Sequence, residues 1–288
     1  MKRKYIQGGI RLFLGCHLSV SGGFFKTALL ADSIGANTFQ YFTRNPRGGK
    51  AKRIDEADIV KAVEFMKERE FGVLLAHASY TMNLCSSKGQ IREFAMDLLK
   101  DDLQRLKHLP NSLYIFHPGS HVGQGVEKGI KWITDALNKA LAINPQQKVL
   151  LEGMSGKGTE IGSTFEELQA IIESVSENQM LGVCLDTCHL YSAGYDIVDN
   201  LEGVLDDFDR TIGLAKLWAV HINDSKTPYN SHKDRHEMIG EGELGLETIV
   251  KVMTHPTLRD LPMSLETPGE PEEHKKEIER IKRQISNH

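Results

Sequence analysis

Short runs of apolar residues recur along the chain, and longer stretches with helical spacing of apolar residues separate them. The runs are RLFLGCH, NTFQYFT, GVLLAHA, SLYIFHP, KVLLEGM, LGVCLDT, LWAVHIN and LPMSLET. Near-continuous apolar runs of this length are typical of strands that are buried on both faces, as in a parallel sheet. The pattern therefore predicts an eight-stranded parallel sheet.

The stretches between the runs carry many charges and repeat their apolar positions every three to four residues. They predict helices at 55–71, 91–109, 129–143, 165–175 and 198–215, and the charged tail EPEEHKKEIERIKRQ predicts a last outer helix. Strand and helix thus alternate throughout. Eight strands in 288 residues match a closed (β/α)8 TIM barrel, an α/β fold, better than an open doubly wound sheet.

No linker or low-complexity segment divides the chain, which predicts a single domain over residues 1–288. The polar stretch 223–245 is long for a loop, and we expect it to be functional. No apolar run approaches the roughly 20 residues of a membrane-spanning helix, and the N-terminal MKRKYIQGGIRLFLG has too short an apolar part for a secretion signal. The sequence predicts a cytoplasmic enzyme without membrane association.

Ionisable side chains stand at the end of nearly every apolar run. In a TIM barrel the carboxyl ends of the strands converge on one mouth, so residues far apart in sequence become neighbours there. The residues concerned are His17, His77, His117, Glu152, Asp186 with His189, His221 and Glu266, and the stretch 223–245 adds Asp234 and His236. Burying so many ionisable groups costs more than a domain's net stability of roughly 5–15 kcal/mol unless a cation compensates.

Imidazole and carboxylate groups suit Zn, Mn or Fe at catalytic sites. A catalytic zinc ion takes about three protein ligands, so the number of potential ligands indicates two or three ions with a bridging carboxylate. Paired metal ions generate a hydroxide nucleophile and hold a phosphoryl group during displacement, which predicts hydrolysis of a phosphate ester. A metal-dependent sugar isomerase on the same barrel uses the same ligand types, so ligand chemistry leaves both reactions open.

The cysteines and the net charge exclude few classes of function. Cys16, Cys85, Cys184 and Cys188 lack paired zinc-site spacing and are expected to be reduced, mostly structural thiols, although two of them flank Asp186 and leave a metal role open. The formal net charge of −4 is not the basic footprint usual in nucleic-acid-binding proteins. Three divalent ions add six positive charges and change this total to +2.

Longer motifs carry a family resemblance. GCHLSVSGG, FTRNPRGG, HASYTMNL, FHPGSH, GVCLDTCHLYSAGYD, HINDSK, DRHEMIGEG and LETP resemble the motifs of endonuclease IV, the zinc-dependent apurinic/apyrimidinic (AP) endonuclease family, from the first strand to the last. The resemblance implies a DNA repair enzyme that cleaves duplex DNA on the 5′ side of an abasic site and leaves 3′-hydroxyl and 5′-deoxyribose phosphate ends. It also implies a trinuclear zinc site, with Mn2+ or Fe2+ as substitutes, and a metal-held hydroxide as the nucleophile.

Nine residues match the metal ligands of that family. The resemblance implies that His77 and His117 hold one ion, that Asp186, His221 and Glu266 hold a second with Glu152 bridging the two, and that His189, Asp234 and His236 hold a third. Glu152 and Glu266 are the expected catalytic residues, and Glu266 also orients or deprotonates the attacking water. His17 is not among the family's ligands and is expected to support them at most.

The resemblance also implies that mouth loops contact DNA, through Arg44, Asn45 and Arg47 of FTRNPRGGKAKR and through Tyr80, whose counterpart enters the duplex near the lesion. The sequence departs from the family after Glu152, where EGMSGKG has Gly153 and Lys157 in place of Asn and Gln. Such changes around a metal site commonly alter affinity or activity 10–100-fold. The segment GGKAKR also lacks an aromatic residue that could contact DNA.

Two alternatives stay open beside the endonuclease, which we expect to be a monomer. One is a metal-dependent sugar isomerase or epimerase of the xylose isomerase-like group, which typically needs one or two metal ions. The other is a DNA-damage-binding barrel without catalysis, which the complete ligand set opposes. The DRHEMIGEG loop and the large ligand set also oppose the isomerase.

Overall fold

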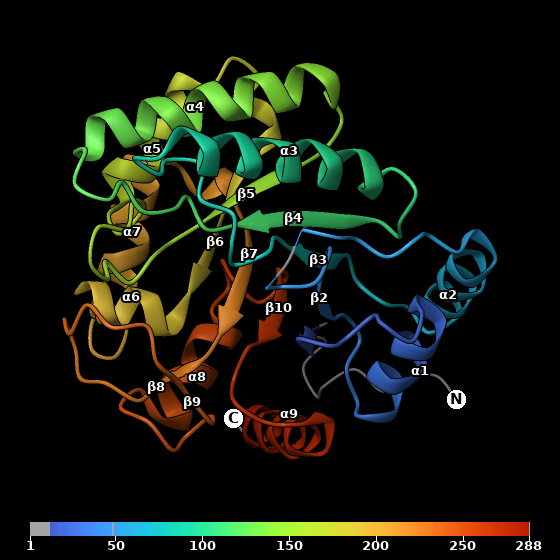
Figure 1. Ribbon diagram of the computed structural model, residues 1–288. Helices are drawn as coiled ribbons and strands as arrows, with labels where there is room; N and C mark the ends of the chain where they lie inside the picture. The colour runs from blue at the N-terminus through green and yellow to red at the C-terminus, as the bar shows by residue number, and fades with distance from the viewer. Residues whose placement is uncertain (1–11, 48, 288) are drawn as a thin grey trace.

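Eight parallel strands stand at the centre of the molecule, with helices around them (Figure 1). The computed structural model describes residues 12–47 and 49–287, so the expectation about a secretion signal falls mostly on residues 1–11, outside the described part. The strands are β1 (Phe13–Cys16), β2 (Gln40–Phe42), β3 (Leu74–His77), β4 (Ser112–Phe116), β5 (Val149–Glu152), β6 (Leu181–Asp186), β7 (Leu217–Ile222) and β10 (Pro262–Leu265). Each lies in one of the predicted apolar runs.

The helices are α1 (Phe24–Ser33), α2 (Glu56–Glu68), α3 (Gly89–Leu106), α4 (Val126–Ile143), α5 (Phe165–Ser174), α6 (Thr187–Ala193), α7 (Leu201–Thr211), α8 (Gly245–Thr254) and α9 (Pro271–Ser286), with short 3-10 turns η1 (Asn178–Met180) and η2 (Leu214–Lys216). The predicted helices are confirmed as α2, α3, α4, α5, α7 and α9, with ends that differ by a few residues. Capping explains some of these differences, because Asp55 caps α2 instead of joining it. None of the predicted helix ranges covers α1, α6 or α8.

The sheet order is β1-β10-β7-β6-β5-β4-β3-β2, and each neighbouring pair is parallel. A bridge between His17 and Gln40 joins the two ends. Beside it, the Asn37 side chain accepts from Leu14 N at 2.9 Å and donates to the main-chain oxygen that precedes β1. The two ends of the sheet meet at a seam beside Gly15. Only glycine fits at this position, because a Cβ there would lie 2.0 Å from a main-chain oxygen of the adjacent segment. The predicted TIM barrel is confirmed.

The barrel interior holds a separate layer of buried apolar side chains, formed by Leu75, Leu113, Ile115, Leu150, Cys184 and Ala219. The main core lies between the strands and the helices. Successive strand residues point to opposite faces, so the residue two positions after an inward-facing one also points inward. At the ends of the strands these residues are His77, His117, Glu152, Asp186 and His221. Strand periodicity therefore directs ionisable side chains into the mouth.

The polar stretch after β7 folds into a small hairpin. β8 (Asp224–Ser225) and β9 (His236–Glu237) pair antiparallel, with Ser225 opposite His236. The two ligands predicted in this stretch, Asp234 and His236, therefore lie on this hairpin. Among the described residues, none of the helices has the length and apolar character that crossing a membrane requires.

Candidate metal centre

The nine predicted ligands come together at the carboxyl ends of the strands. Within each of three groups, the candidate ligand atoms lie within 4.8 Å of one another. The first group is His77, His117 and Glu152, the second is Glu152, Asp186, His221 and Glu266, and the third is His189, Asp234 and His236. Glu152 belongs to two groups, which is the position that a bridging carboxylate requires.

Glu152 lies at the centre of the site and is fully buried. Its Oε2 is 3.1 Å from His77 Nε2 and 3.3 Å from His117 Nε2. Its Oε1 is 3.3 Å from both His189 Nδ1 and His221 Nδ1. One carboxylate therefore faces a pair of imidazoles on each side.

The second and third groups adjoin each other. His221 Nδ1 lies 3.2 Å from Glu266 Oε2 in the second group. In the third group, Asp234 Oδ1 lies 3.4 Å from the Nε2 atoms of His189 and His236. Asp234 and His236 keep side-chain exposures of 32% and 17%, whereas His221 has 0%. The third group is thus the one closest to solvent.

Four atoms of this site are buried without a hydrogen-bond partner among the described residues. They are Glu152 Oε1, His189 Nε2, His221 Nδ1 and His236 Nε2. Leaving a buried polar atom unpaired costs about 1–3 kcal/mol, and all four are lone-pair atoms that can bind a divalent cation. The residues therefore fit metal ions, and the buried His, Asp and Glu clusters are consistent with metal sites.

Main-chain carbonyls hold the second ring nitrogen of two of these histidines. His77 Nδ1 lies 2.7 Å from Ala78 O, and His236 Nδ1 lies 3.1 Å from Glu266 O. A carbonyl accepts only, so these nitrogens carry the protons and Nε2 is left free to bind a cation. The proton assignments follow from the partners of each ring.

The unusual segment after Glu152 contributes through its main chain. His189 Nδ1 donates to Gly153 O at 2.9 Å, and Gly153 N donates to Cys184 O. Because the carbonyl does not depend on the side chain, a glycine at this position keeps the bond that orients His189. Lys157 is exposed, and its main-chain N–H donates to Glu160.

Burial and opposite charges act against each other in the site. Burial disfavours the charged form of Glu152, but His117 and His221 outweigh it and hold the pKa of Glu152 well below its usual value. Burial likewise opposes a charge on His189, and nearby Asp186 is the largest of the carboxylate effects that raise the pKa of His189 well above its usual value. The ring of acids and imidazoles is thus mutually stabilised.

The LDTCH motif is a strand end followed directly by a helix. Asp186 ends β6 and caps α6, because its Oδ1 accepts from His189 N at 2.9 Å. Its Oδ2 accepts from Asn223 Nδ2 at 2.7 Å. His189 lies in the first turn of α6. This places Asp186 and His189 in different ligand groups.

Asp224 supports the site, although no sequence motif predicts this role. The Asp224 carboxylate accepts main-chain N–H bonds from Ser225 and from four residues of the Gly-rich segment 240–245. It thereby fixes the loop that follows β9. The only signal in the sequence is an Asp that precedes a segment with three glycines, IGEGELG, by about 15 residues.

The cysteine expectations fit the structure. All four cysteines are free and buried, and burial raises the thiol pKa to about 12 for Cys16 and Cys85 and to about 11 for Cys184 and Cys188. Cys188 Sγ lies near Asp186 and His236. It also donates to Arg235 O at 3.6 Å, so the protein already gives this thiol a partner.

Arg44, which is predicted to contact DNA, is buried in the structure. Its side chain is 3% exposed and binds inside the protein, with Nε 3.0 Å from Asp102 Oδ1 and Nη2 2.7 Å from Asp101 Oδ2. Nη1 donates to Gly49 O. Arg44 therefore fixes the basic loop to α3, and its contact with DNA stays a prediction. Asn45 and Arg47 are exposed, and Tyr80 is 62% exposed with its ring 5.0 Å from that of Phe42.

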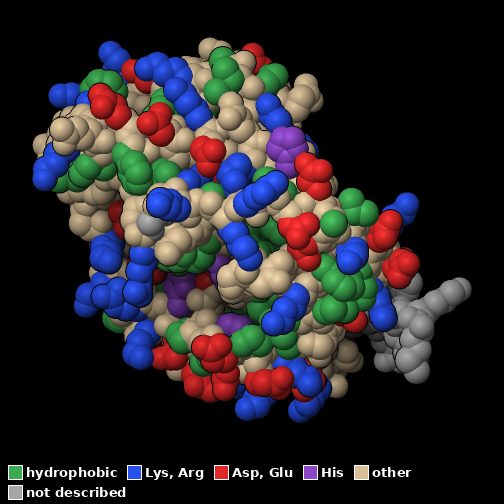
Figure 2. Space-filling model, turned by 45° about the vertical axis from the view of Figure 1, so that its right-hand side comes forward, with side chains coloured by type: hydrophobic (Ala, Val, Ile, Leu, Met, Phe, Trp, Pro, Cys, Tyr) green, Lys and Arg blue, Asp and Glu red, His purple; other side chains and the backbone are tan. Residues whose placement is uncertain are grey.

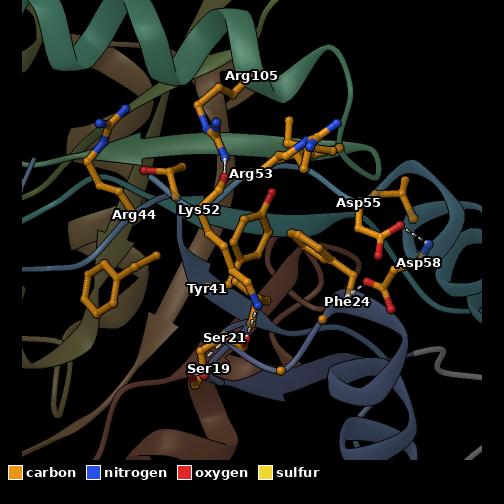
Figure 3. Close-up of a pocket in the computed structure, with 18 of the residues that line it drawn as sticks. Ser19, Ser21, Phe24, Tyr41, Arg44, Lys52, Arg53, Asp55, Asp58 and Arg105 are labelled. Atoms are coloured by element: carbon orange, nitrogen blue, oxygen red, sulfur yellow. Dashed lines mark hydrogen bonds between the residues drawn. The ribbon is translucent and has the colours of Figure 1, made fainter. Parts of the chain in front are cut away.

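A cavity of about 1,370 Å³ lies behind this loop (Figure 3). Arg44, Lys52, Arg105 and His17 are among the residues that line it, and none of the nine predicted ligands does. Lys52 Nζ donates to Ser21 O at 2.6 Å, and Arg105 donates to Lys52 O at 2.5 Å. On the face drawn in Figure 2, histidine side chains are visible inside a hollow that has Lys and Arg side chains on its rim.

A TIM barrel with these ligand groups at its mouth defines a class of metal-binding barrels. A family described as the xylose isomerase-like TIM barrel matches residues 28–284. The probable endonuclease 4 of Akkermansia muciniphila is 55% identical over 277 residues, which cover 96% of this chain and 99% of that protein. The chain belongs to the endonuclease IV family of AP endonucleases.

Solved structures agree with this assignment. The crystal structure of endonuclease IV from Thermus thermophilus superposes with a TM-score of 0.83 at 32% identity and covers 96% of this chain and 99% of that chain. A 3-keto-D-glucoside 4-epimerase from E. coli gives a TM-score of 0.67 at 14% identity, covering 95% of this chain and 100% of that chain. At that identity the likeness concerns the fold alone, and it does not favour the isomerase alternative.

Proposed function

We propose that this enzyme hydrolyses the phosphodiester on the 5′ side of abasic sites in duplex DNA, leaving 3′-hydroxyl and 5′-deoxyribose phosphate ends. The observation that carries the proposal is the set of three ligand groups with four buried, unpaired ligand atoms at the mouth. Membership of the endonuclease IV family supports the reaction class. We further propose a monomeric, cytoplasmic protein with one domain over residues 1–288.

The nine ligands would hold three zinc ions, with Mn2+ or Fe2+ as substitutes. The first group holds one ion, the second group another, and the third group the last. When bound, the ions supply an activated water and stabilise the negative charge that develops on phosphate oxygens. Glu152 belongs to the first two groups, so its carboxylate would determine how far apart the metal positions of these groups lie.

Glu266 is placed to act on the reacting water as well as to bind a metal ion. Its side chain is 12% exposed, whereas Glu152 and Asp186 in the same group have no exposure. Burial works against its ionisation, but His221 dominates and lowers the pKa of Glu266 to about 2. The ionised carboxylate at the open side of the group can orient a water or accept its proton.

DNA contacts would come from the exposed residues of the mouth. Asn45 and Arg47 project from the loop after β2, and Asn45 Oδ1 accepts from Arg47 N at 2.9 Å, which orders the loop tip. Tyr80 lies beside the first ligand group, with its ring 6.1 Å from those of His77 and His117. An exposed aromatic side chain next to the metal positions can stack at the gap left by a missing base.

The test uses an end-labelled duplex with one stable abasic-site analogue and protein of known metal content. We expect a single nick 5′ to the lesion from protein with about three zinc ions per chain, and slower cleavage after prolonged chelation. His77→Ala and Glu266→Gln should each abolish incision and keep the circular dichroism of the parent. Normal incision by both variants would rule out the proposed site.

The same assay separates the alternatives. Fully metallated protein that makes no nick but shifts the duplex in a gel would favour the binding protein without catalysis. Protein that makes no nick and converts aldoses to ketoses would favour the isomerase. An undamaged duplex of the same sequence is the control, and cleavage of it at a similar rate would contradict specificity for abasic sites.

A further inference from the structure

Gln40 is a buried amide at the seam where the barrel closes, and it contacts two members of the second ligand group. Its Oε1 lies 2.7 Å from His221 Nε2, and its Nε2 lies 2.5 Å from Glu266 Oε1. The same Nε2 is 3.1 Å from His17 Nδ1. One side chain thus meets a carboxylate and two imidazoles, and Gln40 itself has no exposed surface.

The partners determine which end of the amide is which. An ionised carboxylate accepts only, so the end at Glu266 must be the NH2 group. The oxygen then faces His221, and since it can only accept, His221 must carry its proton on Nε2. The second N–H of Gln40 points to His17 Nδ1, which therefore accepts and leaves the proton of His17 on Nε2.

The reverse orientation of the amide fails on the same distances. It would place the amide oxygen 2.5 Å from Glu266 Oε1, with no hydrogen between two acceptors. It would also leave the carboxylate oxygen without its donor in a buried site, which is costly. The observed orientation uses both N–H bonds and the oxygen of Gln40.

We propose that Gln40 is the positioning residue of the second ligand group. It keeps the proton of His221 on Nε2, so that the Nδ1 lone pair faces the cation, and it holds Glu266 by Oε1, so that Oε2 faces the same place. His221 Nδ1 and Glu266 Oε2 are 3.2 Å apart. The inference rests on the proposed metal role of this group, because a histidine that presents N–H to a cation cannot bind it.

Metal release gives the first test. The parent and Gln40→Leu are loaded with zinc, and zinc retained per chain is measured against rising concentrations of a chelator. We expect the parent to hold three ions, and the variant to lose one of them at about 10–100-fold lower chelator while keeping the other two as the parent does. Thr38→Val is the control, because the buried Thr38 hydroxyl in the segment before β2 donates to Val73 O and touches no ligand.

A nuclear magnetic resonance signal gives the second test. In zinc-loaded, 15N-histidine-labelled protein the Nε2–H of His221 should be visible and slow to exchange, because Gln40 accepts from it. Gln40→Leu removes the acceptor and should make that proton exchange faster. Gln40→Glu still accepts from His221 but repels Glu266, so it should keep the signal and yet lose one ion early. Loss of buried packing alone would not separate the two variants in this way.

The possible results separate the inference about Gln40 from the proposed function. If the parent holds three ions and Gln40→Leu releases all of them as the parent does, the inference about Gln40 is overturned while the proposed function stands. If Gln40→Leu does not fold, the early release and retained signal of Gln40→Glu decide alone. A parent that takes up no zinc would overturn the proposed function and this inference with it.

Discussion

Arg44 and Asp102 form a buried ion pair at the base of the basic loop. Asp102 has no exposed surface and accepts from Arg44 Nε and Nη2, from Thr43 Oγ1 at 2.8 Å and from the Tyr114 hydroxyl at 2.9 Å. Four donors therefore converge on one carboxylate. Because the loop leaves β2 at Thr43, this network determines the direction in which Asn45 and Arg47 leave the barrel.

Replacing Arg44 by methionine should destabilise the protein strongly. The substitution leaves the buried Asp102 without its charge partner, which typically costs about 3–5 kcal/mol. The free energy of unfolding in urea measures the effect. The matched control is Arg210→Met, which removes an exposed pair with Asp207 and should cost no more than about 1 kcal/mol. A stable Arg44→Met protein that binds DNA more weakly would instead support the prediction that Arg44 contacts DNA.

The contrast between Arg44 and His77 shows what a sequence can predict at the level of single residues. His77 follows the inward-facing Leu75 by two positions, so strand periodicity alone directs it into the mouth. Arg44 lies just beyond β2 in a loop without periodicity. Its partner Asp102 is 58 residues away on a helix, and nothing in either segment indicates the pairing.

At the level of elements, the hairpin β8–β9 and the segment 240–245 behave as one unit. Gly242 lies where Asp224 draws main-chain N–H groups together, and a Cβ there would lie 2.4 Å from Ser225 O and 2.5 Å from Asp224 Oδ1. Ser225 is opposite His236 in the hairpin. Gly242 therefore packs against the strand that pairs with His236, a ligand of the third group.

Gly242→Ala should weaken the third metal position and the fold together. Overpacking of this kind typically costs about 1–3 kcal/mol, and we expect about two zinc ions per chain in place of three. Elemental analysis and urea unfolding measure the two effects. Gly89→Ala is the control, because its Cβ would approach nothing closer than 3.8 Å, and it should keep three ions without loss of stability. Equal metal content in both variants would contradict the coupling.

Elements were predictable from the sequence to the extent that periodicity defines them. The strands and the long amphipathic helices follow from alternation and from helical spacing, as β5 and α4 show. The seven-residue α6 is too short for a periodic signal, and Asp186 is its cap and a candidate ligand at once. α9 is the predicted last outer helix, and it also carries the buried residues His274 and Glu277. Glu277 accepts from Ile239 N and Thr267 Oγ1.

Across the whole molecule, the site gathers ligand atoms that the barrel alone leaves without hydrogen-bond partners. Residues from most of the strands and from the hairpin converge on the three groups, and four of their atoms are unpaired among the residues that the structure describes. A cation that binds the folded state only stabilises it by about 4 kcal/mol when present at 1,000 times its dissociation constant. Ions bound to the three groups would connect strands that are distant in the sequence, and their binding energy would add to the stability of the whole barrel.

Metal removal should lower the melting temperature by on the order of 10 °C, since about 1 kcal/mol corresponds to 2–4 °C for a large domain. The fall should come in steps, because Asp234 and His236 are partly exposed whereas the second group is almost fully buried. Calorimetry during stepwise chelation measures this, with zinc-saturated chelator as the control. Asp234→Asn should remove the first step and leave the later ones. An unchanged melting temperature in protein shown to be metal-free would mean that the ions do not hold the barrel together.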